Sequence, residues 1–237
     1  MKNKFTVAAL LYGDYPKLAE RCLTSIANTF RLEDLNLRVG LNEVAPYITD
    51  WVRSWVPAEN IYEESSNINK YPLLRKMVHG DNPITTDYFM WFDDDSWLVD
   101  HTVGSGTSYW PQLVDHAMVN ADMIGSIYSM DMHPRQRAWI KDQPWYAGKD
   151  PANRKFRFAT GGWWTIRTEI LYKYDWPWPA LSHNGGDSTL GEMLLQQDLR
   201  LRHFNTGVKI NASDHGKESS APRRGTNSKP IGHDFSG

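Results

Sequence analysis

Short apolar runs alternate with segments of helical spacing through the first half of the chain. The runs that predict strands are Phe5–Leu11, Leu35–Leu41, Asn60–Glu63, Asp87–Phe92 and Asp122–Tyr128. The segments that predict helices are Pro16–Phe30, Ala45–Val56, Tyr71–His79 and Tyr109–Asn120. Alternation of this kind, with short connections, is typical of a mostly parallel sheet with helices on both faces. The pattern therefore predicts an α/β fold.

The alternation ends after Met130. Residues 131–157 are polar, aromatic and Pro-containing, so we expect a long loop or flap there. Beyond it we expect a strand at Phe156–Arg167 that is interrupted by Gly161-Gly162, a helix at Asp187–Gln197, and a hairpin of Leu199–Phe204 with Val208–Asn211. From Gly216 the chain is rich in Ser, Pro, Gly and Arg, so we expect residues 216–237 to form a mobile tail.

The length fits one large domain or two closely joined halves. The 237 residues suffice to bury a core, and 41% hydrophobic with 23% charged residues is ordinary for such a protein. A formal net charge of -2 argues against a surface coated with basic residues for non-specific nucleic-acid binding. The 11 Trp residues are compatible with stacking on sugars or bases and equally with a role in the core.

A single cysteine excludes a disulfide within the chain. We expect Cys22 to pack on the apolar face of the first helix. No run approaches the ~20 apolar residues that a membrane span needs. The apolar start ends at Gly13-Asp14-Tyr15-Pro16 without a small-residue cleavage site, so the sequence predicts a cytoplasmic protein with no membrane partner.

Three consecutive carboxylates follow the fourth predicted strand. The apolar run Tyr88–Phe92 leads directly into Asp93, Asp94 and Asp95. Ligands of open parallel sheets bind at the carboxyl ends of the strands. Adjacent carboxylates repel one another, so a hard cation such as Mn²⁺ or Mg²⁺ is a natural partner, and it can bridge a diphosphate. The alternative interpretation is a solvated acidic turn.

These residues carry a resemblance to a known family. Trp91–Ser96 resembles the Asp-x-Asp motif of GT-A glycosyltransferases, in the Asp-Asp-Asp form of the fringe and core-1 galactosyltransferase group. Val7–Gly13 and Leu18–Ile26 look like the opening strand and helix of family 2 glycosyltransferases. The resemblance implies a single GT-A (Rossmann-like) domain over residues 1–215, with a nucleotide-binding half at 1–130 and an acceptor and catalytic half at 131–215.

The resemblance also implies a donor site. By position, Asp95 would ligate the metal with Asp94 alongside it, and Asp93 would face the ribose or base. The turn after the first strand and the loop after the second would contact the nucleotide through Leu11, Tyr12, Asp14, Asn42 and Glu43. This chain has Tyr12-Gly13-Asp14 where family 2 enzymes have a Tyr-Asn-type turn.

Gly161-Gly162 resembles the segment that these enzymes place under the donor sugar and acceptor. Glycine lets the backbone approach a ligand closely, and a β-bulge is the alternative reason for the pair. Trp163 and Trp164 would point to opposite faces of a strand, so one could stack on a sugar while the other packs in the core. We add Trp139, from the basic and aromatic segment, to the acceptor-binding candidates.

Asn184–Gly191 resembles the fringe-type Asp-Asp-x-Thr-x-Gly segment. With Gly186-Asp187 in place of the double acid, Asp187 is the candidate general base for an inverting transfer, and a helix N-cap is the alternative. Many GT-A enzymes complete the metal site with a late His, which would be His215, with His203 as second choice. Arg223, in the tail, could close over the diphosphate.

The acceptor is the least defined part of the prediction. Residues 131–157 hold seven basic residues against three aspartates, a net charge of +4, with aromatic residues between them. Such a segment can bind a nucleic-acid strand or a charged glycan, or act as a flap. We therefore expect a metal-dependent transfer from a nucleotide sugar, a UDP-sugar by preference, to the hydroxyl of a glycan or small molecule, with a hydroxylated DNA base as an alternative.

Two other classes of protein remain as alternatives. One is a sugar-nucleotide pyrophosphorylase, although Leu11–Pro16 lacks the Gly-rich, Arg- and Lys-bearing loop usual after its first strand. The other is a non-catalytic carbohydrate- or nucleic-acid-binding protein derived from a transferase. Such a protein would bind a donor without metal and would not consume it.

Overall fold

A computed structural model describes residues 4–30, 35–99, 109–132, 134–152, 154–183 and 185–211. Its strands are β1 (Phe5–Tyr12), β2 (Asn36–Asn42), β3 (Ile61–Glu64), β4 (Tyr88–Asp93), β5 (Trp97–Leu98), β6 (Met123–Met130), β7 (Phe156–Arg167), β8 (Leu201–His203) and β9 (Val208–Lys209). Its helices are α1 (Pro16–Thr29), α2 (Pro46–Arg53), the short 3-10 helix η2 (Ala58–Asn60), α3 (Lys70–His79), α4 (Trp110–Met118), α5 (Pro134–Lys141), α6 (Thr168–Lys173) and α7 (Gly186–Gln196). No helix in these described ranges has both the length and the apolar character needed to cross a membrane.

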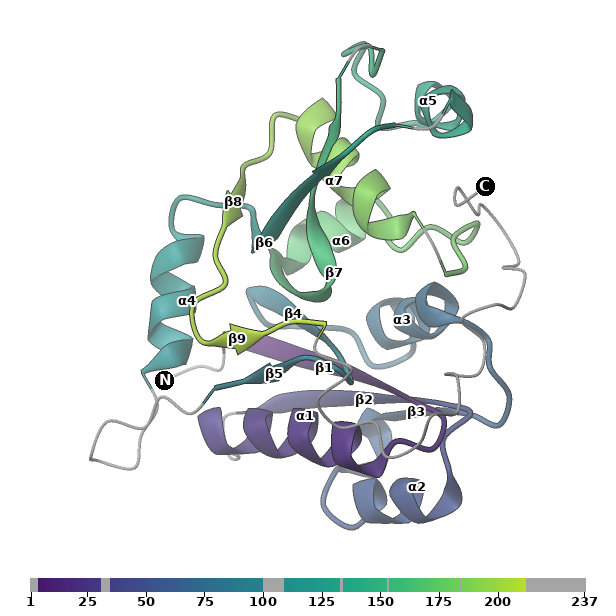
Figure 1. The fold of residues 1–237 in the computed structure, drawn as a ribbon, viewed down its shortest axis with the longest axis vertical. Helices are drawn as coiled ribbons and strands as arrows, with labels where there is room; N and C mark the ends of the chain where they lie inside the picture. Colours follow the sequence, from purple (N-terminus) through teal and green to yellow (C-terminus); the bar gives the residue numbers. More distant parts are fainter. Residues whose placement is uncertain are drawn as a thin grey trace.

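Seven strands form one sheet in the order β3-β2-β1-β4-β7-β6-β8. β1 pairs in parallel with β2 and β4, β2 with β3, and β6 with β8. β7 runs antiparallel to both of its neighbours, β4 and β6. The sheet is mostly parallel and is flanked by helices, which confirms the predicted α/β fold (Figure 1).

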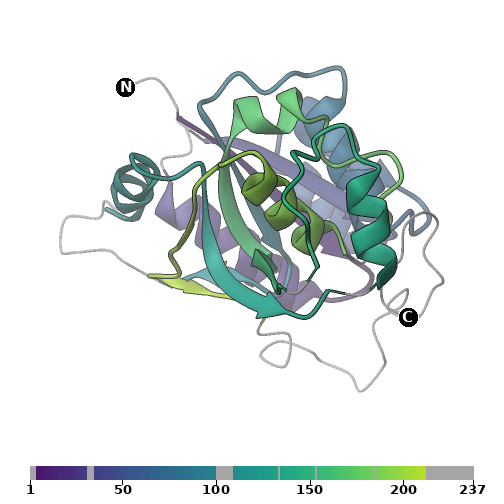
Figure 2. The ribbon, with the colours of Figure 1, turned by 90° about the horizontal axis from the view of Figure 1, so that it is seen from above.

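Helices cover both faces of the sheet. α1, α2 and α4 contribute to one buried apolar cluster, and α3, α6 and α7 contribute to another on the opposite face. In Figure 2, the broad strands β6 and β7 lie between α4 and α7. β4 contributes side chains to both clusters. Phe89 and Trp91 lie in the cluster of α3, and Met90 and Phe92 lie in that of α1. Burial on both faces explains why this strand reads as a continuous apolar run.

A buried arginine holds the C-terminal end of α3. Arg38 lies on β2 and is fully buried, and its guanidinium donates to the backbone carbonyl of Met77 and, at 2.6 Å, to that of Asn82. The last carbonyls of a helix lack partners within the helix, so Arg38 satisfies one of them. Because the opposite end of α3 begins at Lys70, this contact helps to position the site described below.

The predicted hairpin near the end of the described chain is wrong. β8 pairs in parallel with β6, and β9 pairs antiparallel with β5, so the two segments join different sheets. The residues between them are held elsewhere, because the Phe204 N–H donates to the Gly125 carbonyl at 2.9 Å and the Trp110 indole N–H to the Thr206 carbonyl at 2.8 Å. These tertiary contacts separate two strands that the local turn signal would join.

Residues 131–157 are not one long loop, contrary to the prediction. They contain α5, which begins at Pro134 and buries Gln136 and Ile140, one turn apart. Proline suits the first position of a helix because its φ is already helical. Four of the seven basic residues form ion pairs, Lys141 with Asp150, Lys149 with Asp198, Arg154 with Glu192 and Lys155 with Asp131, and two of these acids, Asp198 and Glu192, come from outside the segment.

Close packing of α7 on β7 gives a first prediction. A Cβ at Gly191 would lie 2.2 Å from the backbone carbonyl oxygen of Arg157, which cannot move without shifting β7. We expect Gly191→Ala to lower the free energy of unfolding in urea by about 1–3 kcal/mol, although alanine is the better helix former. Leu195→Ala, at an exposed position of the same helix, is the control and should change stability by less than about 0.5 kcal/mol. Equal effects would contradict the close approach.

Candidate functional site

The carboxyl ends of β1, β2 and β4 meet at one edge of the sheet. In the parallel register Tyr12 lies opposite Asn42, and Leu10 lies opposite Asp93. Tyr12, Asn42 and Asp93, which we predicted as donor-site residues from three separate segments, are therefore brought to the same edge. This is the edge at which ligands of open α/β sheets bind.

The three aspartates form a tight turn at this edge. The Ser96 N–H donates to the Asp93 carbonyl at 3.0 Å, and the chain then enters β5. Asp94 and Asp95 are only 3% and 9% exposed, so the alternative of a solvated acidic turn is wrong. Cys22 of α1 is fully buried beneath the turn, and burial together with the three carboxylates raises the pKa of its thiol well above the ordinary value. Its predicted packing role is confirmed.

Lys70, the first residue of α3, joins β4 to β7. Its ammonium group donates to Asp93 Oδ2 at 3.0 Å and to the Gly161 carbonyl at 2.8 Å. The indole N–H of Trp91 donates to the same two groups, at 3.0 Å to Asp93 Oδ1 and at 2.9 Å to the Gly161 carbonyl. Burial alone would lower the pKa of Lys70, but the carboxylates of Asp93 and Asp187 outweigh it and the pKa is raised. Lys70 therefore carries a positive charge.

Asp187 lies in the first turn of α7, and its carboxylate lies near Lys70 and Gly161. Its Oδ1 accepts a hydrogen bond of 2.9 Å from the Tyr71 hydroxyl. Burial raises the pKa of Asp187, Asp93 raises it further, and Lys70 and the Tyr71 hydrogen bond oppose this shift. The N-cap of α7 is Gly185, without a side-chain capping bond, so the alternative of Asp187 as N-cap is wrong. Burial and Asp187 also raise the pKa of Tyr71 well above its ordinary value, which keeps the phenol a donor.

Two glycines allow these groups to meet. A Cβ at Gly161 would lie 2.3 Å from Asp187 Oδ2 and 2.8 Å from Lys70 Nζ. A Cβ at Gly186 would lie 2.1 Å from the Tyr71 ring. The lack of a side chain at Gly161 therefore permits the predicted close approach to the backbone. The groups that approach it are the side chains of Asp187 and Lys70.

Asn42 organises the loop that leads into α3. Its Nδ2 donates to Asn67 Oδ1 at 2.9 Å, and its Oδ1 accepts from the Ile68 N–H at 3.0 Å. Asn69, the next residue, has a φ of 70° and precedes Lys70 directly. The side chain of Asn42, predicted to touch the nucleotide, thus also fixes where Lys70 begins its helix.

The other predicted donor residues occupy different environments. The Leu11 side chain is 1% exposed in the cluster of α1, so only its backbone can reach a ligand. Asp14 accepts a hydrogen bond from the Tyr47 hydroxyl. Glu43 adopts a φ of 55° and its N–H donates to the Glu64 carbonyl at 2.9 Å. Their contacts with a donor remain predictions.

The end of the described chain returns to the aspartate turn. The Asn211 N–H donates to Ser96 Oγ at 3.1 Å, and its Nδ2 donates to Thr160 Oγ1 at 2.9 Å. A Cβ at Gly162 would lie 2.2 Å from Asn211 Oδ1, so this second glycine also admits a neighbouring segment. His215 and Arg223 follow Asn211 in the sequence but lie outside the described residues.

Two of the three predicted acceptor-binding tryptophans belong to the core, and the third, Trp139, is partly buried against it. Trp163 and Trp164 point to opposite faces, as predicted, but both are fully buried, so the prediction that one stacks on a sugar is wrong. Trp139 packs edge-on against Trp145 and Trp178, with ring centroids 6.0 and 5.4 Å apart. The large apolar area of these rings is used to fill both clusters.

Within the described ranges, no group of three or more His, Cys, Asp or Glu side chains is arranged to hold a metal. His203, our second choice as ligand, lies on β8 and accepts a hydrogen bond of 3.1 Å from the Ile127 N–H. The carboxylates of Asp94 and Asp95 nevertheless fit a hard divalent ion, because such ions prefer oxygen ligands.

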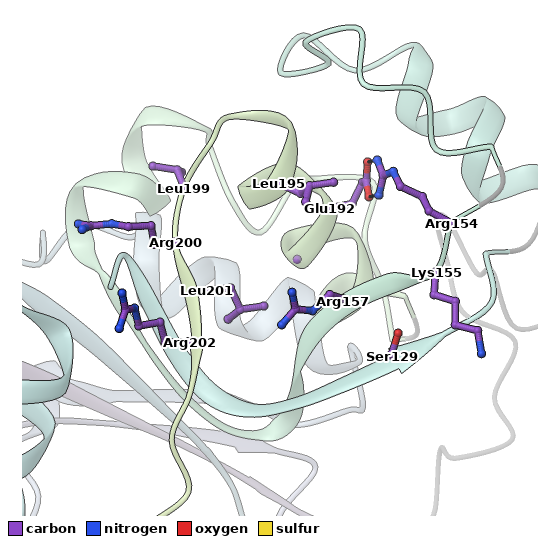
Figure 3. Close-up of a pocket in the computed structure, with 11 residues that line it drawn as sticks. Ser129, Arg154, Lys155, Arg157, Glu192, Leu195, Leu199, Arg200, Leu201 and Arg202 are labelled. Atoms are coloured by element: carbon purple, nitrogen blue, oxygen red, sulfur yellow. Dashed lines mark hydrogen bonds and ion pairs between the residues drawn. The ribbon is translucent and has the colours of Figure 1, made fainter. Parts of the chain in front are cut away.

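A separate pocket of about 560 Å³ lies between α7, β6, β7 and β8 (Figure 3). Leu195, Leu199 and Leu201 line its apolar part, and Arg154 on its wall is paired with the buried Glu192. None of the predicted site residues within the described ranges lines this pocket. The candidate site is therefore the aspartate turn with the cluster around Asp187.

Sequence reasoning missed three residues of this cluster, Lys70, Tyr71 and Trp91. The helix was predicted to begin at Tyr71, which placed Lys70 in the preceding loop. A usable signal was present, because Lys70 and Tyr71 open the helix after the third predicted strand and so lie at the carboxyl edge of a parallel sheet. Trp91 could not be told apart from the apolar strand around it.

The partly buried carboxylate of Asp187 gives a prediction on pH and stability. A raised pKa in the folded protein means that stability falls as the pH rises from about 3.9, the unfolded value, through the folded value. Asp187→Asn removes this loss. We expect the free energy of unfolding of the variant, relative to the unsubstituted protein, to rise across this window and then level off, in urea titrations with a chelator.

Tyr71→Phe is the companion variant for this test. It removes a hydrogen bond that lowers the pKa of Asp187, so the window should extend to higher pH. A relative stability of Asp187→Asn that fell with rising pH would contradict the assigned direction.

Comparisons with known proteins were made at the level of sequence and of structure. No family model matches the sequence, and no curated protein matches it. Solved structures do match. The mannosyltransferase PcManGT from Pyrobaculum calidifontis, in complex with GDP-Man and Mn²⁺, has a TM-score of 0.57 and 14% identity, over 86% of this chain and 55% of its own.

TarS 1–349 from S. aureus has a TM-score of 0.55 and 12% identity, over 87% of this chain and 58% of its own. The structure of TarS in complex with UDP-GlcNAc matches with a TM-score of 0.51. This chain thus spans just over half the length of these proteins. At such low identity the similarity concerns the fold, and it covers most of the chain. This protein has a GT-A-like α/β fold.

Proposed function

We propose that this protein is a metal-dependent glycosyltransferase that moves a sugar from a nucleotide sugar to an acceptor hydroxyl. The observation that carries the proposal is the carboxylate of Asp187, held by the Tyr71 hydroxyl beside Gly161 at the sheet edge that also bears the aspartate turn. A partly buried base next to a cluster of oxygen donors is the arrangement that such a transfer needs.

The donor would bind at the aspartate turn. Mn²⁺ or Mg²⁺ would be held by Asp95 with Asp94 alongside, and when bound it neutralises the charge of the departing diphosphate. Two similar structures contain GDP-Man or UDP-GlcNAc, which supports a nucleoside diphosphate sugar, and we retain a UDP-sugar as first choice. Tyr12, Asp14, Asn42, Glu43 and the Leu11 backbone would surround the nucleotide.

Residues beyond the described chain would complete the donor site. Asn211 is bonded to Ser96 beside the turn, and His215 follows it by four residues. We propose His215 as a further metal ligand and Arg223 as a contact of the diphosphate. Asp93 would contribute less to the ligand than predicted, because Lys70 and Trp91 already engage both of its carboxylate oxygens.

Asp187 would act as the general base. It accepts the proton of the acceptor hydroxyl while that oxygen attacks the anomeric carbon, and the bond from this carbon to the diphosphate breaks with its electron pair leaving on the diphosphate. Burial raises the pKa of Asp187 and so makes it a stronger base than an exposed carboxylate. Direct displacement from the opposite face inverts the anomeric configuration.

The acceptor would be a glycan or a small molecule. A hydroxylated DNA base loses support, because Asp198 and Glu192, from outside residues 131–157, pair with Lys149 and Arg154 and lower the net positive charge of this segment. The ring of Trp145 stacks on that of Trp178, which leaves less aromatic surface for stacking on bases.

Loss of the base should abolish turnover and spare donor binding. We expect Asp187→Asn to lower kcat by about 10²–10⁴-fold, with a donor affinity within threefold, because the amide cannot accept the proton. Sugar transfer is measured with the donor and acceptor found by screening UDP- and GDP-sugars, and the anomeric configuration of the product by NMR. Asp198→Asn, exposed just beyond α7, is the matched control and should retain activity. Full activity of Asp187→Asn, or a retained configuration, would remove Asp187 as the base.

The metal gives a second test. A nucleotide sugar with Mn²⁺ should raise the Tm of the unsubstituted protein, by about 2–4 °C for each kcal/mol of binding free energy, and Asp95→Asn should lose this shift. Asp131→Asn, at an exposed aspartate, should keep it. Donor binding that needs no metal and leads to no consumption would instead support a non-catalytic binding protein. Formation of a nucleotide sugar from a sugar phosphate and a nucleoside triphosphate would support a pyrophosphorylase.

A further inference from the structure

Lys70 is a cation within the described part of the candidate site, and the proposed reaction does not use its charge. Its side chain is 11% exposed, and its ammonium group contacts the last residue of β4 and a backbone carbonyl of β7. A mostly buried ammonium group loses its hydration, so several interactions with the protein are needed to compensate for that loss. Its position therefore points to a function of the charge.

The ammonium group lies close to the proposed base. A single point, the position of a Cβ at Gly161, is 2.3 Å from Asp187 Oδ2 and 2.8 Å from Lys70 Nζ. The two atoms are therefore at most about 5 Å apart, a range in which an opposite charge lowers the pKa of a carboxyl by about 1–3 units. No hydrogen bond joins them among the described contacts, so the influence of Lys70 on Asp187 is that of its charge.

The other groups that act on Asp187 are few. α3 contributes Lys70 and the Tyr71 hydroxyl, and β4 contributes the carboxylate of Asp93. β7 presents the uncharged Gly161 at this point, and within α7 the nearest acid along the helix, Glu192, is paired with Arg154. Burial and Asp93 favour the protonated form of Asp187, and Lys70 is the charge that opposes them.

We propose that Lys70 is a positioning residue that keeps Asp187 ionised, and therefore able to accept a proton, while it ties this base to the aspartate turn. The inference rests on the proposed transferase activity. The charge of the ammonium group acts on Asp187. Its hydrogen bonds to Asp93 and Gly161 align the two halves of the site. Charge and hydrogen bonding can be separated by substitution.

The test compares Lys70→Gln with Lys70→Arg. Glutamine retains N–H donors but has no charge, whereas arginine retains the charge. We expect the acidic limb of the profile of kcat/KM against pH to move up by at least one pH unit in Lys70→Gln. Activity at a pH on that limb should then fall at least tenfold more than activity at the plateau. Lys70→Arg should return the limb to its original place.

Lys76→Gln is the matched control. It removes the same charge from the same helix, at a side chain that is 55% exposed and paired with Glu64. We expect no movement of the acidic limb in this variant. A limb unchanged in Lys70→Gln, or moved equally in Lys76→Gln, would overturn the proposal.

A measurement on the unsubstituted protein does not depend on turnover. Carboxyl ¹³C NMR, with Asp187→Asn to identify the resonance, follows the titration of Asp187 directly. Asp187 ionised at pH 7, with a pKa that rises in Lys70→Gln, supports the proposal. Asp187 protonated at pH 7 overturns it, and this result also decides the case if Lys70→Gln does not fold. Absence of sugar transfer with every donor, together with an ionised Asp187, would overturn the proposed function and not the charge effect.

Discussion

The ammonium group of Lys70 is bonded to the carboxylate of Asp93 and to the backbone carbonyl of Gly161, and the candidate site depends on this contact. The uncharged indole N–H of Trp91 donates to the same two acceptors. The bond from Trp91 to Gly161 thus joins β4 directly to the glycine segment of β7, and the two bonds of Lys70 bridge the same strands from α3. Because partly buried polar networks are stable only when their members are satisfied, loss of one donor would affect the whole arrangement.

The topology of the sheet makes this contact available. β7 is inserted antiparallel next to β4, with Phe92 opposite Trp163, so the glycines before Trp163 pass the aspartates after Phe92. α7 packs on β7 and places Asp187 at Gly161, where a side chain would collide with it. The site is therefore assembled from a parallel half that ends at the aspartate turn and an antiparallel strand that brings the glycines and the base.

Aromatic and basic residues serve the fold more than the sequence suggests. Trp91, Trp110, Trp163, Trp164 and Trp176 are all fully buried. The basic residues of 131–157 are largely engaged in ion pairs with aspartates and with the buried Glu192. Aromatic and basic residues of kinds that often bind ligands thus make contacts within the protein. These contacts join α5, α7 and the extended ends of β6 and β7 to the rest of the domain.

The sequence by itself determined the fold class, the aspartates at the end of β4 and the glycine and Asp187 segments, because each depends on a local pattern of apolar strands, acidic residues or glycine. It could not separate Trp163 and Trp164 as core residues from stacking residues, since burial depends on what packs above a strand. It also missed that Lys70 and Tyr71 reach Asp187, more than a hundred residues away. Only the tertiary structure decided these points, because the order of strands in the sheet, and not the distance along the chain, sets which side chains meet.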